Sequence, residues 1–371
     1  MSGENWYSLL QPDDVDSPAL LVYPDRVMKN ISTAIEMTGD VSRLRPHIKT
    51  NKSPDATALL IAAGVTKFKC ATIAECELLG LAGAKDVLLA YQPIGPKIRR
   101  FAEIIRKYSS TTYSCLIDNE DAAHAMGRYF DASGLNVPVF VDLNVGQGRT
   151  GIEAGLPAAL LYRVAETIPG INPVGLHAYD GHVRHRDFSL RKQECDACFA
   201  LVENTRDAIV KAGQAVPLIV AGGSPSFSVH CRRGNCECSP GTFIYWDKGY
   251  CDLCPEQDFL PAALVLSRII SIPGPTTICL DLGHKAVAAE NEITRRVYFL
   301  NAPGLRAISQ SEEHLVLETA GNHEFKVGDI LYGMPVHICP TVALYERAFV
   351  VRDGQVEGEW RNTARDRKIT I

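Results

Sequence analysis

The stretch L-R-P-H-I-K-T-N-K, residues 44–52, opens a regular alternation of strand-like and helix-like segments. Pro46 suits the start or the edge of a strand, because proline has no amide proton and a fixed φ. Alternation along a strand then places His47 and Lys49 on the same face. A lone lysine at a strand end is usually solvated. Here the basic residues near Lys49, which include Arg45, would lower the pKa of its amine. They instead predict a lysine that forms a Schiff base with a carbonyl cofactor.

Working outward, short β-branched or aromatic segments recur, and each is followed by a segment of helical length. The strands predicted for this part of the chain are residues 44–49, 67–71, 86–90, 112–117, 138–143, 174–178, 218–221 and 242–246. The helices predicted are residues 25–37, 54–63, 73–82, 96–108, 119–132, 157–166 and 189–212. This count is typical of an α/β fold, the (β/α)8 TIM barrel. An open doubly wound sheet is the alternative, although no G-x-G-x-x-G motif follows an early strand.

The pattern changes near residue 256, where helical spacing nearly disappears. Short strand-like segments separated by turn signals take its place, at residues 264–273, 276–280, 296–300, 314–319, 329–334 and 348–352. One further strand is predicted early in the chain, at residues 18–23. We therefore expect a barrel over residues 19–255 and a mostly β C-terminal domain over residues 256–371, joined by the N-terminal arm, residues 1–18.

Composition excludes several classes of protein. The 371 residues include 38 Lys and Arg against 43 Asp and Glu, so a nucleic-acid-binding footprint is not expected. No basic segment followed by an apolar run marks the N-terminus as a signal peptide, and no apolar run is long enough to span a membrane. We expect a cytoplasmic protein whose partner is a small molecule, with neither nucleic acid nor membrane as a partner.

The twelve cysteines mostly lie singly within apolar segments, as expected of free thiols in a reducing compartment. Five of them form a cluster whose spacing could ligate zinc, namely Cys231, Cys236, Cys238, Cys251 and Cys254. The spacing matches no standard zinc motif well, and a cysteine-rich loop is the alternative.

Active sites of barrels lie where the strands end, so the residues that follow each predicted strand are the candidates. The A-G-G-S-P-S turn contains Gly222, Gly223 and Ser224, which could hold a phosphate through backbone N–H groups and hydroxyls. The segment H-A-Y-D-G-H-V-R-H contains further candidates, namely His177, Tyr179, Asp180, His182 and His185, of which the histidines could act as bases, acids or metal ligands. The other strand ends add Asn144, Gln147, Arg149, Tyr245, Asp247 and Tyr250.

In the C-terminal part, P-V-H-I-C-P-T places His337 and Cys339 at positions i and i+2. In a strand both side chains would face one side. An imidazole together with a thiolate suits Zn²⁺, and two protein ligands leave positions for water or substrate. The pair is therefore a candidate metal site.

Taken together, these motifs make the chain resemble the D-threonine aldolase and D-serine dehydratase family, pyridoxal-phosphate enzymes built on the alanine-racemase-like barrel. The matching motifs are R-P-H-I-K-T-N-K, V-D-L-N-V-G-Q-G-R-T-G, Y-D-G-H-V-R-H, A-G-G-S-P-S, S-P-G-T-F-I-Y-W-D and P-V-H-I-C-P-T-V. They occur in the family's order and extend over nearly the whole chain.

The resemblance implies a role for each motif. Lys49 would carry pyridoxal 5'-phosphate, with His47 and Tyr179 also at the cofactor, and Arg149 would face the pyridine nitrogen. Gly222, Gly223 and Ser224 would hold the phosphate, with Tyr245 nearby. His337 and Cys339 would bind a divalent metal, Zn, Mn or Mg. The second subunit of a homodimer commonly completes such sites.

The activity that the resemblance implies first is an aldolase acting on D-β-hydroxy-α-amino acids, which cleaves D-threonine to glycine and acetaldehyde. His185, or otherwise His182, would remove the hydroxyl proton, with Tyr179 in the same site. The close alternative is a dehydratase that converts D-serine to pyruvate and ammonia. An amino-acid racemase and a non-catalytic carrier of the cofactor are further alternatives.

The sequence departs from the family pattern at two positions. Asn51 stands where many relatives have a histidine. The H-x-C pair resembles the dehydratases, whereas the G-H-x-x-H run resembles the aldolases.

Overall fold

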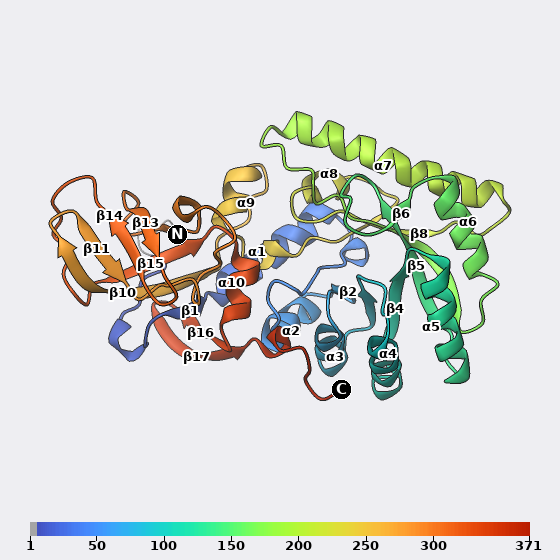
Figure 1. Cartoon of the computed structure of the whole chain (residues 1–371), viewed down its shortest axis with the longest axis horizontal. Helices are drawn as coiled ribbons and strands as arrows, with labels where there is room; N and C mark the ends of the chain where they lie inside the picture. The colour runs from blue at the N-terminus through green and yellow to red at the C-terminus, as the bar shows by residue number, and fades with distance from the viewer. Residues whose placement is uncertain (1–5) are drawn as a thin grey trace. The chain divides into compact units, whose positions relative to one another are not determined.

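The computed structural model describes residues 6–371, and the chain divides into two compact units (Figure 1). The first, which we call the β unit, takes the chain up to Ile31, Thr50–Ala56 and Thr242–Arg365. The second, the α/β unit, takes Ser32–Lys49, Thr57–Gly241 and Asp366–Ile371. In this division the β unit resumes at Thr242, and the predicted domain bounds of residues 19–255 and 256–371 stay a prediction. Residues 1–5 of the predicted N-terminal arm lie outside the described residues.

The α/β unit contains a curled parallel sheet with the strand order β2-β3-β4-β5-β7-β8-β9 and a short β6 beside β5. These strands are β2 (Lys67–Cys70), β3 (Asp86–Leu89), β4 (Thr112–Ile117), β5 (Val137–Asn144), β6 (Ile152–Glu153), β7 (Ile171–Ala178), β8 (Leu218–Ala221) and β9 (Glu237–Cys238). The helices that follow them are α3 (Ile73–Leu81), α4 (Pro96–Lys107), α5 (Glu120–Ala132), α6 (Leu156–Ala165), α7 (Phe188–Lys211) and α8 (Phe227–His230). Figure 1 shows helices α3 to α7 along the outside of this sheet, so the predicted alternation of strands and helices is confirmed.

Local sequence signals explain where these helices begin. The side chains of Thr72, Asn119 and Asp187 each accept a hydrogen bond from a backbone N–H in the first turn of α3, α5 and α7. Such caps satisfy amide groups that have no partner inside the helix. After α3, Gly83 adopts a φ of +79°, a conformation that glycine reaches without steric cost. Helix length and position could therefore be predicted within a residue or two.

The predicted first strand, residues 44–49, is not a regular strand but two isolated bridges. Leu44 pairs in parallel with Cys238, and His47 pairs in parallel with Lys69. Backbone hydrogen bonds of 2.9 to 3.0 Å attach residues 44–48 to both edge strands, β9 and β2. This short segment therefore joins the two edges of the sheet and closes an eight-member ring.

The predicted eighth strand, residues 242–246, is wrong. Thr242–Ile244 form a 3-10 helix, and the eighth member of the ring is β9, Glu237–Cys238. The segment T-F-I-Y-W has strand propensity but lies in the β unit, where tertiary packing overrides that propensity.

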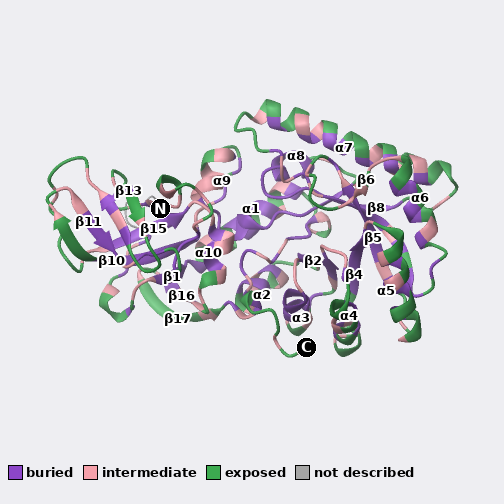
Figure 2. Ribbon diagram, viewed as in Figure 1, coloured by how far each residue is buried: buried purple, intermediate pink, exposed green. Residues whose placement is uncertain are grey.

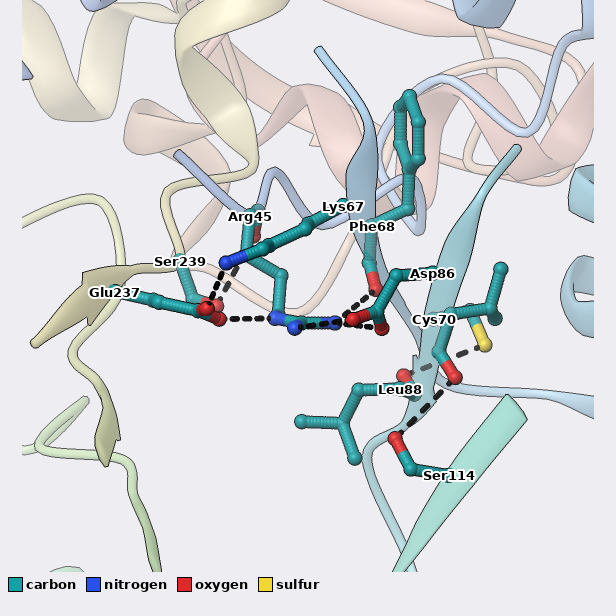
Figure 3. A network of polar contacts seen from close by, with 10 residues as sticks. Arg45, Lys67, Phe68, Cys70, Asp86, Leu88, Ser114, Glu237 and Ser239 are labelled. Atoms are coloured by element: carbon teal, nitrogen blue, oxygen red, sulfur yellow. Dashed lines mark hydrogen bonds and ion pairs between the residues drawn. The ribbon is translucent and has the colours of Figure 1, made fainter. Parts of the chain in front are cut away.

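A buried ion-pair network fixes the closing segment inside the α/β unit (Figure 3). The Arg45 side chain is only 1% exposed, and its Nε lies 2.6 Å from Glu237 Oε2. Its Nη1 lies 2.6 Å from Asp86 Oδ1, and Lys67 forms a second ion pair with Glu237. Arg45 thus connects the closing segment to β9 and β3. Burial alone would lower the pKa of Arg45, but the hydrogen bonds and charges of Asp86 and Glu237 outweigh it and raise that pKa.

The β unit contains a nine-stranded sheet with the path β13-β14-β11-β10-β1-β16-β17, in which β15 pairs with β10 and β12. These strands are β1 (Ala19–Val22), β10 (Ala263–Gly274), β11 (Thr277–Leu280), β12 (Val297–Phe299), β13 (Arg306–Gln310), β14 (Leu315–Glu318), β15 (Ile330–Pro335), β16 (Arg347–Arg352) and β17 (Gln355–Arg361). Its helices are α9 (Lys248–Leu253) and α10 (Ile338–Leu344), and the unit boundaries fall inside α1 (Pro24–Thr38) and α2 (Pro54–Ala62).

Two features of the β unit differ from the prediction. The strand β1 belongs to this sheet, between β10 and β16, although the expected barrel began at residue 19. Strands β13 and β17 were missed. Figure 2 shows β17 as largely exposed, and its sequence Q-V-E-G-E-W-R lacks the apolar face of a buried strand. In the part of the chain that the structure describes, no helix has both the length and the apolar character needed to cross a membrane.

Candidate active site

Cationic side chains gather around the ring of Tyr179 in the α/β unit. Tyr179 directly follows β7, and Arg149 lies on the glycine-rich loop after β5. The Lys49 Nζ lies 5.7 Å from the ring centroid, and the Arg149 guanidinium carbon lies 4.9 Å from it. A third cation, Lys69 on β2, has its Nζ 5.9 Å from the same centroid. The structure therefore brings together three predicted site residues, Lys49, Arg149 and Tyr179, and adds Lys69.

Lys69 was not predicted as a site residue. It is 2% exposed, and its Nζ lies 3.5 Å from Nε2 of His177 on β7. Nδ1 of the same histidine lies 2.7 Å from Asp142 Oδ1 on β5. Burial, followed by the charge of Lys49, lowers the pKa of Lys69 to about 7. The sequence held one signal for it. Lys67 and Lys69 alternate in K-F-K-C, and because one face of a barrel strand points inward, a lysine of this strand could be expected inside the barrel.

His47, the other predicted cofactor residue near Lys49, has a local role in the fold. Its Nδ1 accepts a hydrogen bond of 3.2 Å from the backbone N–H of Lys49. The turn that carries Lys49 is thereby held against the bridge that His47 forms with β2. Asn51 also has a structural explanation, because its Oδ1 accepts a hydrogen bond from the Ser53 N–H ahead of α2.

The A-G-G-S-P-S turn packs closely in the α/β unit. The Gly222 N–H donates to the Ala178 carbonyl at 2.9 Å, and the Gly223 N–H donates to Ser226 Oγ at 3.2 Å. Both amides that were predicted to face a phosphate are thus engaged within the chain. A Cβ at Gly223 would lie 2.7 Å from Tyr179 Cε2, so glycine is needed there for contact with the ring. The phosphate-binding role of this turn stays a prediction.

Ser226 of this turn belongs to a buried polar cluster. The Ser226 hydroxyl donates to Asp180 Oδ1 at 2.6 Å, and His230 Nε2 lies 2.7 Å from Asp180 Oδ2. Burial would raise the pKa of Asp180, but the charge and hydrogen bond of His230, aided by Ser226, lower it. Among the described residues, the one group of three donors that could hold a metal ion is Asp180, Cys195 and His230, whose ligand atoms lie within 4.8 Å of one another. Burial raises the pKa of the Cys195 thiol, which favours a hydrogen-bonded cluster.

The cysteine cluster predicted as a zinc alternative receives no support from the described residues. Cys231, Cys236 and Cys238 lie in the α/β unit, whereas Cys251 and Cys254 lie in the β unit. No three of these five thiols form a metal-ligating group in the described part of the chain.

The two histidines of the G-H-x-x-H run lie beside Glu194 of α7. His185 Nε2 is 2.9 Å from Glu194 Oε2, and the His185 side chain is 51% exposed. The His182 side chain is 25% exposed, and a Cβ at Gly146 would lie 2.6 Å from its Nε2. His182 Nδ1 and Gln147 Oε1 are buried atoms without a hydrogen-bond partner among the described residues. Such atoms often mark a place where water or a ligand binds, so His182 is at least as good a candidate as His185.

In the β unit, His337 and Cys339 do not lie on a strand as predicted. They begin helix α10, with His337 as its N-cap residue. Their side chains nevertheless hydrogen bond to each other. Nδ1 of His337 is also 2.5 Å from Glu290 Oε1, and Cys339 Sγ lies 3.1 Å from Thr50 Oγ1. A nitrogen and a sulfur donor are therefore adjacent, in the geometry of a helix start.

Negative charge surrounds this pair. Burial would lower the pKa of His337, but the hydrogen bond and charge of Cys339, with Asp247 and Glu290, raise it to about 9. This local field favours a cation at the imidazole, whether a proton or a metal. Tyr245 also lies in the β unit, where it is 1% exposed and where burial raises its pKa. Its predicted place near the phosphate stays a prediction.

The curled parallel sheet, with a lysine, an arginine and a tyrosine gathered where its strands end, defines an alanine-racemase-like α/β protein. The model of the alanine racemase N-terminal domain family matches residues 22–248, and the chain belongs to this family. A second family model, described as a serine dehydratase domain, matches residues 262–351.

The similarity to known proteins covers nearly the full chain. A D-threonine aldolase of Arthrobacter sp. is 28% identical over 369 residues, which cover 96% of this chain and 95% of that protein. A 3-hydroxy-D-aspartate aldolase of Paracoccus denitrificans is 26% identical, with 96% and 94% covered. A D-threo-3-hydroxyaspartate dehydratase of Delftia sp. is 23% identical, with 92% and 96% covered. The solved structure of D-threonine aldolase from Filomicrobium marinum aligns with a TM-score of 0.88 at 26% identity, covering 95% of this chain and 96% of that one.

Proposed function

We propose that this protein is a pyridoxal-phosphate-dependent lyase of the D-threonine aldolase type. It would cleave D-β-hydroxy-α-amino acids such as D-threonine into glycine and an aldehyde. The observation that carries the proposal is the gathering of Lys49 and Arg149 on the Tyr179 ring, within a fold that aligns over almost its whole length with D-threonine aldolases. The activities of these relatives make a small D-amino acid the expected substrate.

The residues present fit pyridoxal phosphate. The amine of Lys49 can form the Schiff base, and the cluster of Lys49, Lys69 and Arg149 suits a cofactor that carries a phosphate and a phenolate. When bound, the cofactor stabilises the negative charge left on Cα after a bond to that carbon breaks. Tyr179 would limit the movement of the bound cofactor. Gly223 and Gly181 leave room for the Tyr179 side chain because they have no Cβ.

The chain's own residues would move the hydroxyl proton. A histidine can accept it near neutral pH, and Glu194 orients His185 through a contact of 2.9 Å. We assign the base to His185, with His182 as the alternative that its buried, unpartnered Nδ1 supports. Separate His185→Gln and His182→Gln variants test the assignment. The variant that loses at least about a hundredfold in kcat identifies the base.

The donors of the β unit fit a divalent metal. His337 and Cys339 supply a nitrogen and a sulfur in mutual contact, and the charges of Asp247 and Glu290 favour a cation there. A metal held by this pair would lower the pKa of a bound hydroxyl group.

A dehydratase is the second candidate, because the H-x-C pair and the serine dehydratase domain match both point to it. Incubation of the purified protein with D-threonine, with L-threonine as the control, distinguishes the two. The aldolase gives glycine and acetaldehyde from the D-isomer. Formation of 2-oxobutyrate alone would establish the dehydratase instead, and no product from either isomer would refute both.

Lys49→Ala tests the cofactor assignment. The wild-type protein should show a visible absorbance band after incubation with pyridoxal phosphate, and borohydride should fix the cofactor to Lys49. The variant should lose this attachment, whereas Lys85→Met, which alters an exposed lysine of the same unit, should keep it. If borohydride still attached the cofactor covalently to the Lys49→Ala protein as in the wild type, the assignment of Lys49 would be refuted.

The proposal includes a homodimer in the cytoplasm, which is supported by the resemblance to family members that share sites between subunits. Light scattering coupled to size-exclusion chromatography tests the dimer. A monomeric mass for a catalytically active sample would contradict it.

A further inference from the structure

Lys69 is a buried amine near the proposed cofactor site to which the proposed reaction assigns no proton transfer. It lies on β2, is 2% exposed, and shares the Tyr179 ring with Lys49 at nearly the same distance, 5.9 against 5.7 Å. Lysine is seldom fully buried unless it is paired, because desolvation of its charge is costly. A lysine in this position therefore needs a structural or a functional explanation.

The surroundings of Lys69 form a hydrogen-bonded chain. Asp142 on β5 holds Nδ1 of His177 at 2.7 Å, which fixes the ring and leaves Nε2 as the acceptor that faces Lys69 at 3.5 Å. Burial lowers the pKa of His177 in spite of Asp142, so the imidazole is neutral and can accept from the lysine. The chain runs from a carboxylate inside the sheet to an amine beside Lys49.

Charges from several elements act on the Lys69 amine. Lys49 and Arg45 of the closing segment disfavour its proton, whereas Asp142 of β5 and Asp180 after β7 favour it. Arg149, on the loop after β5, acts on the same chain through His177. With burial these charges bring the pKa of Lys69 to about 7, so its proton can be gained or lost near neutral pH.

We propose that Asp142, His177 and Lys69 form a buried proton-holding chain, in which Lys69 is a positioning residue whose charge controls protonation at the Schiff-base nitrogen of Lys49. When Lys69 carries a proton, it repels a second positive charge at Lys49 and favours the unprotonated Schiff base. When Lys69 is neutral, that repulsion disappears. The inference rests on the proposed function, because it assumes that Lys49 carries pyridoxal phosphate.

The main test follows the visible absorbance of the holoenzyme from pH 5.5 to 9.5, since the band of a pyridoxal-phosphate Schiff base changes when its nitrogen loses a proton. In Lys69→Met the midpoint should rise by about one pH unit, because a like charge beside the same Tyr179 ring has been removed. The matched control Lys85→Met removes an exposed lysine of the same unit and should leave the midpoint unchanged. Superposition of the Lys69→Met and wild-type curves would overturn the inference.

A second measurement covers the case in which Lys69→Met does not bind the cofactor. The holoenzyme is produced in cells supplied with 13C-labelled lysine and is followed by NMR. One lysine ε-carbon resonance should titrate near neutral pH. Asp142→Asn removes a charge that favours the proton on Lys69, so this resonance should titrate at lower pH in the variant. A protein in which every lysine resonance titrates above pH 9 would overturn the inference.

The two proposals fail in different ways. If wild-type protein shows no visible band with pyridoxal phosphate, the proposed function fails. If the band is present and Lys69→Met leaves its titration unchanged, only the role of Lys69 fails.

Discussion

The buried amine of Lys69 predicts an unusual dependence of folding stability on pH. Folding lowers its pKa from 10.5 to about 7, chiefly because burial disfavours the charge. The shift corresponds to a cost of about 5 kcal/mol in the free energy of unfolding, at about 1.4 kcal/mol for each pKa unit. Lys69→Met removes the charge while keeping a side chain of similar length, so the variant should be more stable than the wild type. The lost contact with His177 offsets about 1 kcal/mol of this gain.

The sign of the pH dependence follows from proton linkage. Below pH 7 both the folded and the unfolded wild-type chain carry the proton on Lys69, and the full cost is present. Between pH 7 and 10.5 only the unfolded chain carries it, so wild-type stability rises with pH and the cost disappears. The advantage of Lys69→Met should therefore shrink from about 4 kcal/mol at pH 6 to about 1 kcal/mol at pH 9.

Urea denaturation of the cofactor-free proteins at pH 6 and pH 9, followed by far-UV circular dichroism, measures this difference. Titrating groups remote from Lys69 are common to both proteins, so their contributions cancel in the comparison. Lys85→Met is the control and should show no pH-dependent difference, since Lys85 is exposed. An advantage of Lys69→Met that is equal at the two pH values, or a variant less stable than the wild type at pH 6, would contradict a lowered pKa of Lys69 in the folded chain.

Three further perturbations test the fold and the two candidate sites. Arg45→Met should lower the free energy of unfolding by about 3 kcal/mol, because it removes the ion pair of the half-buried Asp86 and leaves the buried Glu237 with Lys67 as its remaining cation. Arg99→Met, which removes an exposed pair on α4, should have little effect, and an equal loss in both variants would contradict the role of the network. Gly223→Ala should weaken pyridoxal-phosphate binding at least about tenfold in a fluorescence titration, because the new Cβ would meet Tyr179 Cε2 at 2.7 Å, and unchanged affinity would show that the ring is free to move. Cys339→Ala should abolish stoichiometric metal measured by mass spectrometry while the far-UV spectrum is retained, and retention of the metal would place its site elsewhere.

The metal-site candidates of the β unit show why spacing along the sequence predicts only part of a site's geometry. The positions i and i+2 of His337 and Cys339 were interpreted as one face of a strand, yet the segment begins helix α10. The side chains still meet, because the N-cap residue of a helix is itself extended, with φ −134° and ψ 99°. The sequence located the donors, and the helix start determines how they are presented.

The sequence alone predicted the α/β alternation, the bounds of most helices and strands, and Lys49, Arg149 and Tyr179 as candidate site residues. These features depend on periodicity, caps and turn residues, which act over a few neighbouring positions. The family resemblance carried the expectation of a D-amino-acid lyase, because the ordered motifs are more specific together than any one of them alone.

The closure of the ring and the polar contacts inside it join residues that are far apart in the sequence, so they became visible only in the folded chain. Closure depends on the bridges of Leu44 and His47 to strands that lie far away in the sequence, and on the buried ion pairs of Arg45. The contact between Lys69 and His177 joins residues 108 positions apart. No local pattern records such a pairing, because burial and charge act through space, and a lysine that looks like a strand-end residue in K-F-K-C becomes a buried amine only once the sheet has curled around it.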